Sequence, residues 1–267
     1  MKLSIVLSSQ PAQFQAATFQ GDLETNLSHV ASLGYDGVEL AIRDPELIDL
    51  ESLDGLVRKF SLQVPAIGTG QAWGEEGLSF TDPDPGVRSD AIERIKSHIP
   101  VASHFGAVII IGLLRGIVKP GIEHSQAMSW LIKALRECSD AAQLHGVRLA
   151  LEPINRYETT LINNASEGLN LIERVGADNF GLLLDTFHMN IEEADIQASV
   201  RACGKYIFHF HVADSNRWYP GAGHLDFAST LEALFATGYQ GWISGEFLPK
   251  PDAAIAARES IQYLQML

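Results

Sequence analysis

Four residues with metal-binding or acid–base side chains stand at the ends of apolar segments in the second half of the sequence. They are separated by 33, 26 and 35 residues, and they are Glu152, Asp185, His211 and Glu246. The first of them ends the run "LALE" and is followed at once by a proline. A carboxylate on a segment this apolar is costly to bury unless it is paired or bound to a metal. The repeated placement therefore indicates one shared site.

The chemistry of these four side chains predicts a divalent metal centre. Three crowded carboxylates repel one another, and a divalent cation removes that repulsion. A mostly oxygen ligand set with one imidazole suits Mn²⁺ or Mg²⁺ better than a metal that prefers thiolates. Any one of the residues alone could instead be a helix cap or an ion-pair partner. Four such residues at matching strand ends favour a common role as metal ligands.

Short apolar runs alternate with longer amphipathic segments along the whole chain. The runs predict strands at 2–7, 37–42, 62–68, 107–113, 147–152, 180–185, 206–212 and 242–246. The amphipathic segments predict helices at 23–32, 46–60, 90–105, 126–144, 165–175, 195–202, 227–236 and 252–266. Eight strands, each followed by a helix, predict an α/β fold with a single (β/α)8 TIM barrel over residues 1–267. A doubly wound open sheet has the same periodicity, and the count of eight strands favours the barrel.

A barrel of this kind brings the carboxyl ends of all its strands to one face, where catalytic groups lie. Further polar residues follow the late strands, namely Glu158 in "EPINRYE", His188 in "DTFHMN" and Arg217 in "HVADSNR". His209 precedes His211 by two residues and should share its strand face, so we expect a packed histidine of the inner strand rather than a ligand. The glycine-rich segment 68–77 lacks the lysine and the following helix of a phosphate-binding loop, and it predicts a mobile loop near the pocket.

With these motifs, the sequence resembles the xylose isomerase-like TIM barrels, and among them the ketose 3-epimerases typified by D-tagatose and D-psicose 3-epimerase. The resemblance is strongest over "EPINRYE", "DTFHMNIEE", "HFHVADSNRWYPGAGH" and "GEF". It implies a set of metal ligands: Glu152, Asp185, His211 and Glu246. It also implies a set of residues that hold the sugar near its carbonyl: Glu158, His188 and Arg217. The implied activity is a metal-dependent epimerisation at carbon 3 of a ketose, with Mn²⁺ as the expected ion and Mg²⁺ or Co²⁺ as alternatives.

Physical reasoning agrees with that reaction. Moving a proton on a carbon beside a ketone needs a base, and it needs a group that stabilises the resulting enediolate. A divalent cation polarises the carbonyl and stabilises the anion. Glu152 and Glu246 follow separate strands of the barrel and could flank a substrate as acid and base. His188 and Arg217 would supply hydrogen-bond donors at the carbonyl end.

Other functions remain open within the same barrel. They are hydroxypyruvate isomerase, inosose dehydratase, another ketose/aldose isomerase, and a barrel that binds a sugar without catalysis. The zinc-dependent apurinic endonucleases are excluded, because strands three and four end in "AIGTG" and "IIIGLL" without the histidines that a trinuclear site requires. The sequence identifies neither the ketose nor whether it is phosphorylated, although a free sugar is favoured.

Composition limits the partners and the compartment. The formal net charge of −14 opposes binding to nucleic acid, and the longest apolar run, "AVIIIGLL", is too short to span a bilayer. Only two cysteines occur, Cys138 and Cys203, and the N-terminal segment lacks the long apolar core of a secretory signal. We therefore expect a cytoplasmic enzyme whose partner is a small-molecule ketose. A homodimer or homotetramer is expected from the resemblance.

Overall fold

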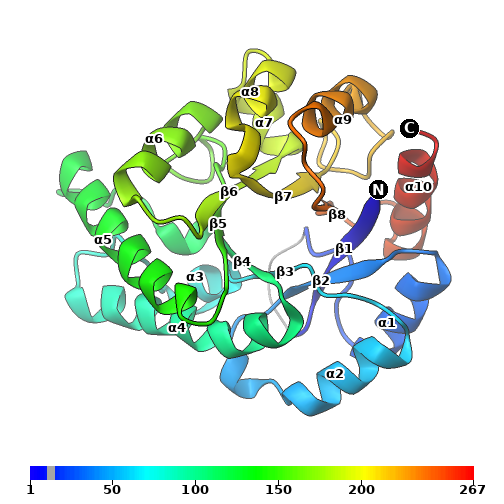
Figure 1. The fold of residues 1–267 in the computed structure, drawn as a ribbon, viewed down its shortest axis with the longest axis horizontal. Helices are drawn as coiled ribbons and strands as arrows, with labels where there is room; N and C mark the ends of the chain where they lie inside the picture. Colours follow the sequence, from blue (N-terminus) through cyan, green and yellow to red (C-terminus); the bar gives the residue numbers. More distant parts are fainter. Residues whose placement is uncertain (11–15) are drawn as a thin grey trace.

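The computed structural model describes residues 1–10 and 16–267, and its strands close into a parallel barrel in the order β1 to β8 (Figure 1). Every strand pairs in parallel with its neighbour in sequence, and β8 pairs with β1. The strands are β1 (Lys2–Ser8), β2 (Gly37–Ala41), β3 (Ala66–Gly68), β4 (Val108–Ile111), β5 (Leu149–Leu151), β6 (Phe180–Asp185), β7 (Ile207–Val212) and β8 (Trp242–Gly245). The predicted (β/α)8 barrel is confirmed.

Helices surround the barrel as a ring (Figure 1). The α-helices are α1 (Leu23–Ser32), α2 (Leu50–Lys59), α3 (Gln71–Glu76), α4 (Pro85–Phe105), α5 (His124–Gln143), α6 (Ala165–Val175), α7 (Thr186–Glu192), α8 (Ile196–Cys203), α9 (Phe227–Ala236) and α10 (Ala253–Gln265). Short 3₁₀ helices are η1 (Pro45–Leu47), η2 (Leu113–Arg115) and η3 (Gly204–Tyr206). None of the helices in the described ranges combines the length and the apolar character that crossing a membrane requires.

Helices α3, α4 and α7 differ from the sequence prediction, and α7 lies in a segment where no helix was predicted. Helix α4 begins at Pro85, earlier than expected, because Asp84 caps it by accepting a hydrogen bond from the Gly86 amide while Pro85 occupies the first turn. In a sequence this "DPDPG" stretch is typical of a turn. The glycine-rich segment that was expected to be a mobile loop contains α3, which is capped at its carboxyl end by Gly77 in the left-handed conformation.

The alternation of the strands separates two layers of buried side chains. One set packs against the helices in the main core, as Val38 and Leu40 of β2 do. The other set points into the barrel, where Leu183 of β6 packs in a smaller cluster with alanine, valine and isoleucine side chains of β3 to β5. Polar groups on this inner face therefore lie in a confined apolar space.

A shift in strand register between β6 and β7 places histidines on the inner face. Leu182 pairs with Ile207, but Leu183 pairs with His209, so one residue of β7 has no counterpart in β6. As a result His211 lies directly opposite Asp185.

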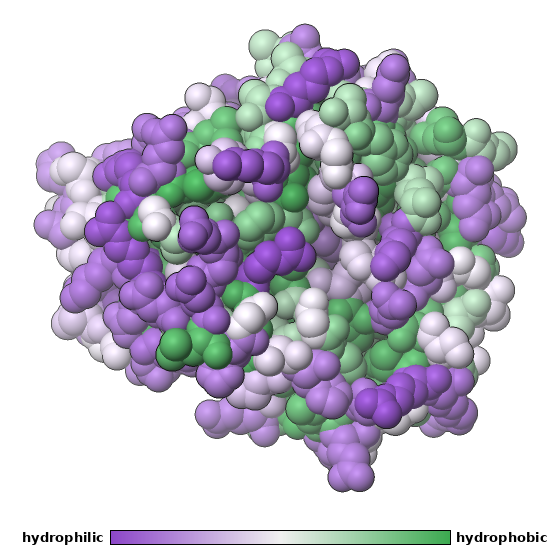
Figure 2. Space-filling view, viewed as in Figure 1, coloured by the Kyte–Doolittle hydropathy of each residue, from purple (hydrophilic) through white to green (hydrophobic). Residues whose placement is uncertain are grey.

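From outside, hydrophilic residues cover most of the visible face, with smaller hydrophobic patches between them (Figure 2).

Candidate metal centre and active site

The four residues predicted as metal ligands come together at the carboxyl ends of β5 to β8. Each offers one ligand atom, these atoms lie within 4.8 Å of one another, and all four residues are buried. Asp185 ends β6 and His211 lies in β7, whereas Glu152 and Glu246 directly follow β5 and β8. The sequence spacing therefore located a real cluster, and its role as a metal centre stays a prediction.

The cluster contains polar atoms that have no hydrogen-bond partner among the described residues. Glu152 Oε1, Asp185 Oδ2 and His211 Nδ1 are buried without a hydrogen bond. His211 Nδ1 stands 3.9 Å from Asp185 Oδ2 and 3.8 Å from Glu246 Oε2, which is too far for hydrogen bonds. Ligands that each lie about 2 Å from one cation stand roughly 3–4 Å apart. The donor set and its spacing fit a divalent ion.

The electrostatics of the cluster also favour a bound cation. Burial, and then the charge of Glu246, raise the pKa of Glu152 well above its ordinary value. Burial likewise raises the pKa of Asp185, and it raises the pKa of Glu246 to about 7 although His211 and Arg217 oppose the shift. Burial opposes charge on His211, yet the nearby carboxylates raise its pKa to about 10. The site thus stabilises positive charge at its centre.

Asp185 serves the fold and the site with different oxygens. Its Oδ1 accepts a hydrogen bond from the Phe187 amide and caps helix α7. This bond fixes the carboxylate, so Oδ2 faces the other proposed ligands. Because α7 follows β6 directly, Asp185 is both the last residue of the strand and the cap of the helix, and this capping bond sets the orientation of its side chain.

A second group of polar residues surrounds His188, which lies on α7. The Asn155 amide donates through Nδ2 to Glu158 Oε1 at 2.9 Å and to His188 Nδ1 at 2.8 Å, and its Oδ1 accepts from the Tyr157 amide. Since Nδ1 accepts, the proton of His188 lies on Nε2, which is 3.6 Å from Glu152 Oε1. Burial lowers the pKa of His188 well below its ordinary value, so the ring is neutral and offers one donor to the site. The sequence analysis missed Asn155, although it lies in the quoted "EPINRYE" motif.

Arg217 lies on the loop after β7 and reaches the carboxylates. Its guanidinium is 3.1 Å from Glu158 and 3.4 Å from Glu246, and it lies over the Phe187 ring with 4.9 Å to the centroid. The backbone of Arg217 has φ of +59°, an uncommon value for a residue with a side chain. A hydrogen bond from the Leu248 amide to the Arg217 carbonyl helps to hold this conformation. Such strain is typical of functional loops.

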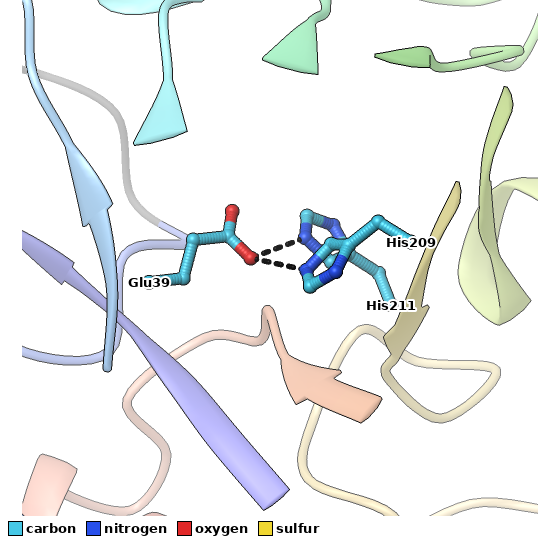
Figure 3. A group of neighbouring side chains, drawn as sticks. All are labelled: Glu39, His209 and His211. Atoms are coloured by element: carbon cyan, nitrogen blue, oxygen red, sulfur yellow. Dashed lines mark hydrogen bonds and ion pairs between the residues drawn. The ribbon is translucent and has the colours of Figure 1, made fainter. Parts of the chain in front are cut away.

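Two buried charged residues that the sequence analysis missed contact members of the cluster. Arg115 of η2 is fully buried and donates to the Glu152 carbonyl. Glu39 of β2 accepts hydrogen bonds from His209 and His211, as Figure 3 shows. His209 is buried and packed inside the barrel, as predicted, and the strand pattern gave no sign of its acidic partner.

A cavity of about 250 Å³ opens over these groups. All the predicted site residues except Asp185 line it, namely Glu152, Glu158, His188, His211, Arg217 and Glu246. Gln71 and Trp73 of α3 line the same cavity, so the glycine-rich segment does border the pocket. At about 250 Å³ the cavity is slightly smaller than pockets for drug-sized ligands, so a small molecule fits it beside the proposed ligands.

Comparisons with known proteins agree with this geometry. A family profile described as xylose isomerase-like TIM barrel matches residues 27–266. The chain belongs to the xylose isomerase-like TIM barrel family. Within that family, curated relatives include an L-ribulose 3-epimerase of Mesorhizobium japonicum, which is 33% identical over 235 residues, 87% of this chain and 78% of the relative. A D-psicose 3-epimerase of Ruminiclostridium cellulolyticum is 30% identical over 232 residues, 84% of this chain and 77% of the relative.

A solved structure of the same family supports the comparison. A D-allulose 3-epimerase from Methylomonas sp. in complex with D-allulose superposes with a TM-score of 0.83 and 26% identity, covering 100% of this chain and 96% of that one. These relatives are carbohydrate epimerases, and the predicted class of enzyme, an isomerase acting on sugars, is confirmed.

Proposed function

We propose that this protein is a ketose 3-epimerase that depends on a divalent cation. The carrying observation is a cluster of four buried residues whose ligand atoms lie within 4.8 Å of one another at the base of the cavity, three of which have an atom without a hydrogen bond. In this proposal the ion is held by Glu152, Asp185, His211 and Glu246. The sugar is held by Glu158, His188 and Arg217. The names of the relatives support the choice of a ketose as substrate.

The protein side chains perform the proton transfers. One carboxylate, Glu152 or Glu246, removes the proton from carbon 3 and leaves an enediolate across carbons 2 and 3. The other carboxyl group returns a proton to the opposite face of carbon 3, so the configuration inverts and no electrons are lost. A pKa raised toward neutrality, as at Glu246, lets a carboxyl group both accept and return a proton.

The remaining polar groups hold the reacting end of the sugar. His188 is neutral and presents its Nε2–H to the site, so it can donate to the carbonyl oxygen without adding a competing charge. Arg217 pairs with Glu158 and Glu246 and brings positive charge beside the carboxylates. When bound, the divalent cation polarises the carbonyl and stabilises negative charge on the substrate oxygens.

The finer assignments are part of the proposal. The oxygen-rich ligand set favours Mn²⁺, with Mg²⁺ or Co²⁺ as alternatives. A free ketose is favoured over a phosphorylated one, because Arg217, the arginine that lines the cavity, is already paired with carboxylates. An assembly of two or four chains, the absence of a nucleic-acid or membrane partner, and a cytoplasmic location stay predictions from the sequence.

Turnover in heavy water tests the mechanism. Epimerisation by two carboxyl groups that exchange protons with solvent labels carbon 3 of the product with deuterium, whereas aldose–ketose isomerisation labels carbon 1 or 2. Glu246→Gln should keep the fold and abolish turnover and label, since an amide cannot act as the base. Glu232→Gln, on the exposed face of α9, is the matched control and should behave as the wild type. An epimer formed without label at carbon 3 would refute the mechanism.

A further inference from the structure

We infer that Glu39 is a positioning residue of the metal centre, which orients His211 by accepting a hydrogen bond from its Nε2–H. The inference rests on the proposed metal site and concerns a residue outside the ligand set. Glu39 is 1% exposed and lies on β2, whereas every proposed ligand comes from β5 or later. Its contact with His211 crosses the interior of the barrel, because β1 and β8 separate β2 from β7 around the wall (Figure 3).

The geometry defines which ring nitrogen of His211 can bind an ion. His211 Nε2 lies 2.9 Å from Glu39 Oε2, and this contact requires the proton to be on Nε2. The other nitrogen, Nδ1, lies on the side of Asp185 and Glu246. An ion that binds at Nδ1 replaces any proton there, while Nε2 keeps its proton as the donor to Glu39. Carboxylates that hold a metal-binding histidine in this manner fix its tautomer and raise its basicity.

His209 completes the arrangement by holding Glu39 itself. Its Nε2 lies 2.8 Å from the same oxygen, Glu39 Oε2, and its ring meets the His211 ring edge-on with centroids 5.2 Å apart. Two donors on one oxygen leave the carboxylate little freedom to rotate. The register shift between β6 and β7 is what places both rings on the inner face.

A second metal ion at Glu39, His209 and His211 is the competing explanation, since these three residues also offer ligand-type atoms close together. The distances favour hydrogen bonds instead. Both nitrogens touch one carboxylate oxygen at 2.8 and 2.9 Å, whereas the atoms of the proposed metal centre stand 3.8 and 3.9 Å apart without direct contact. Hydrogen bonds already fill the space between the three side chains.

Metal affinity tests the inference independently of catalysis. Purified protein is stripped with EDTA, exchanged into buffer, and titrated with Mn²⁺ alone, and the number of ions and the Kd are measured. We expect one ion for each wild-type chain. Glu39→Ala should raise the Kd about 10–100-fold, the range typical for residues that support metal ligands. Glu39→Gln should raise it less, because an amide oxygen still accepts but makes weaker hydrogen bonds.

Two further variants separate positioning from simple loss of stability. His209→Phe keeps a ring of similar size and removes one donor to Glu39, so the Kd should rise by a smaller factor than in Glu39→Ala. His98→Gln is the matched control, because His98 is fully buried on α4 and bonds to the Arg94 and Ile42 carbonyls away from the site. It should lower the Tm of the metal-free protein while the Kd stays that of the wild type.

The outcomes distinguish the inference from the proposed function. If the wild type binds no Mn²⁺, the metal site itself is wrong. If the wild type binds one ion and Glu39→Gln has the same Kd, only the positioning role is overturned, and this variant decides the matter even where Glu39→Ala fails to fold. Two ions per wild-type chain, with one lost in His209→Phe, would overturn it in favour of a second metal site.

Discussion

Replacing Arg115, the buried arginine behind the proposed metal ligands, should destabilise the barrel strongly. Arg115 is fully buried, and its guanidinium donates to four backbone carbonyls: from Nε to Gly112 at 3.0 Å, from Nη1 to Ile162 at 3.1 Å and Leu161 at 3.4 Å, and from Nη2 to Glu152. These bonds join the end of β4, the end of β5 and the loop before α6. Arg115→Met keeps most of the side-chain volume and leaves the carbonyls without their donor.

The magnitude follows from the number of bonds. Each hydrogen bond from a charged donor contributes about 1.5–3 kcal/mol, so the three shorter ones amount to roughly 5–9 kcal/mol. Burying the guanidinium itself costs several kcal/mol, which the substitution recovers. We therefore expect Arg115→Met to lower the free energy of unfolding by about 3 kcal/mol.

Urea unfolding of the metal-free protein, followed by circular dichroism, measures this change. Arg136→Met is the matched control: Arg136 also donates to two backbone carbonyls, those of Arg174 and Val175, but it is exposed on α5. We expect it to change the free energy of unfolding by less than about 1 kcal/mol. A loss below 1 kcal/mol in Arg115→Met, equal to that of the control, would show that the buried bonds contribute little and refute the reasoning.

Three further predictions concern the site. Removing divalent metal with EDTA should abolish turnover, and added Mn²⁺ should restore it. His211→Ala should weaken Mn²⁺ binding while the circular dichroism spectrum stays that of a folded barrel. Full activity of the metal-free protein would contradict the proposed metal site. Arg217→Ala and His188→Ala should each lower kcat/KM about 10²–10³-fold, or roughly 3–4 kcal/mol, with the metal still bound by elemental analysis; wild-type kinetics would give both residues a structural role. Asn155→Leu removes the donor to His188 Nδ1 and should lower kcat/KM about tenfold, near 1.4 kcal/mol, with metal content unchanged; an unchanged value would mean that His188 keeps its orientation without this bond.

The candidate ligands could be found from the sequence because strand ends are a local property. Glu152 and Glu246 each follow a short apolar run, and a closed parallel barrel brings all such positions to one face. Asp185 could be found in the same way. The second role of Asp185, as the cap of α7, could be recognised only in the structure, because "DTFHMN" gives no sign that a helix follows the strand directly.

Other features of the site could not be predicted, because they depend on contacts between segments that lie far apart in the sequence. The hydrogen-bond partners of Glu39, His209 and His211, lie 170 and 172 residues later in the sequence, and nothing in "GVEL" indicates them. The register shift that turns His209 and His211 inward is a relation between β6 and β7, not a property of either strand. Arg115 lies in "LLRG", where an arginine is normally solvated, and its partners are carbonyls of distant segments.

The hydrogen bonds of Glu39 also have a consequence for the order of folding. Every proposed ligand comes from the last four strands, so a fragment starting at β5 would contain the complete ligand set. It would lack the carboxylate that orients His211, which β2 supplies from the first quarter of the chain. Contacts between such distant positions form late, because loop closure must come first. A half barrel should therefore bind the ion weakly, and full affinity should emerge only when the two halves of the chain have closed into one ring.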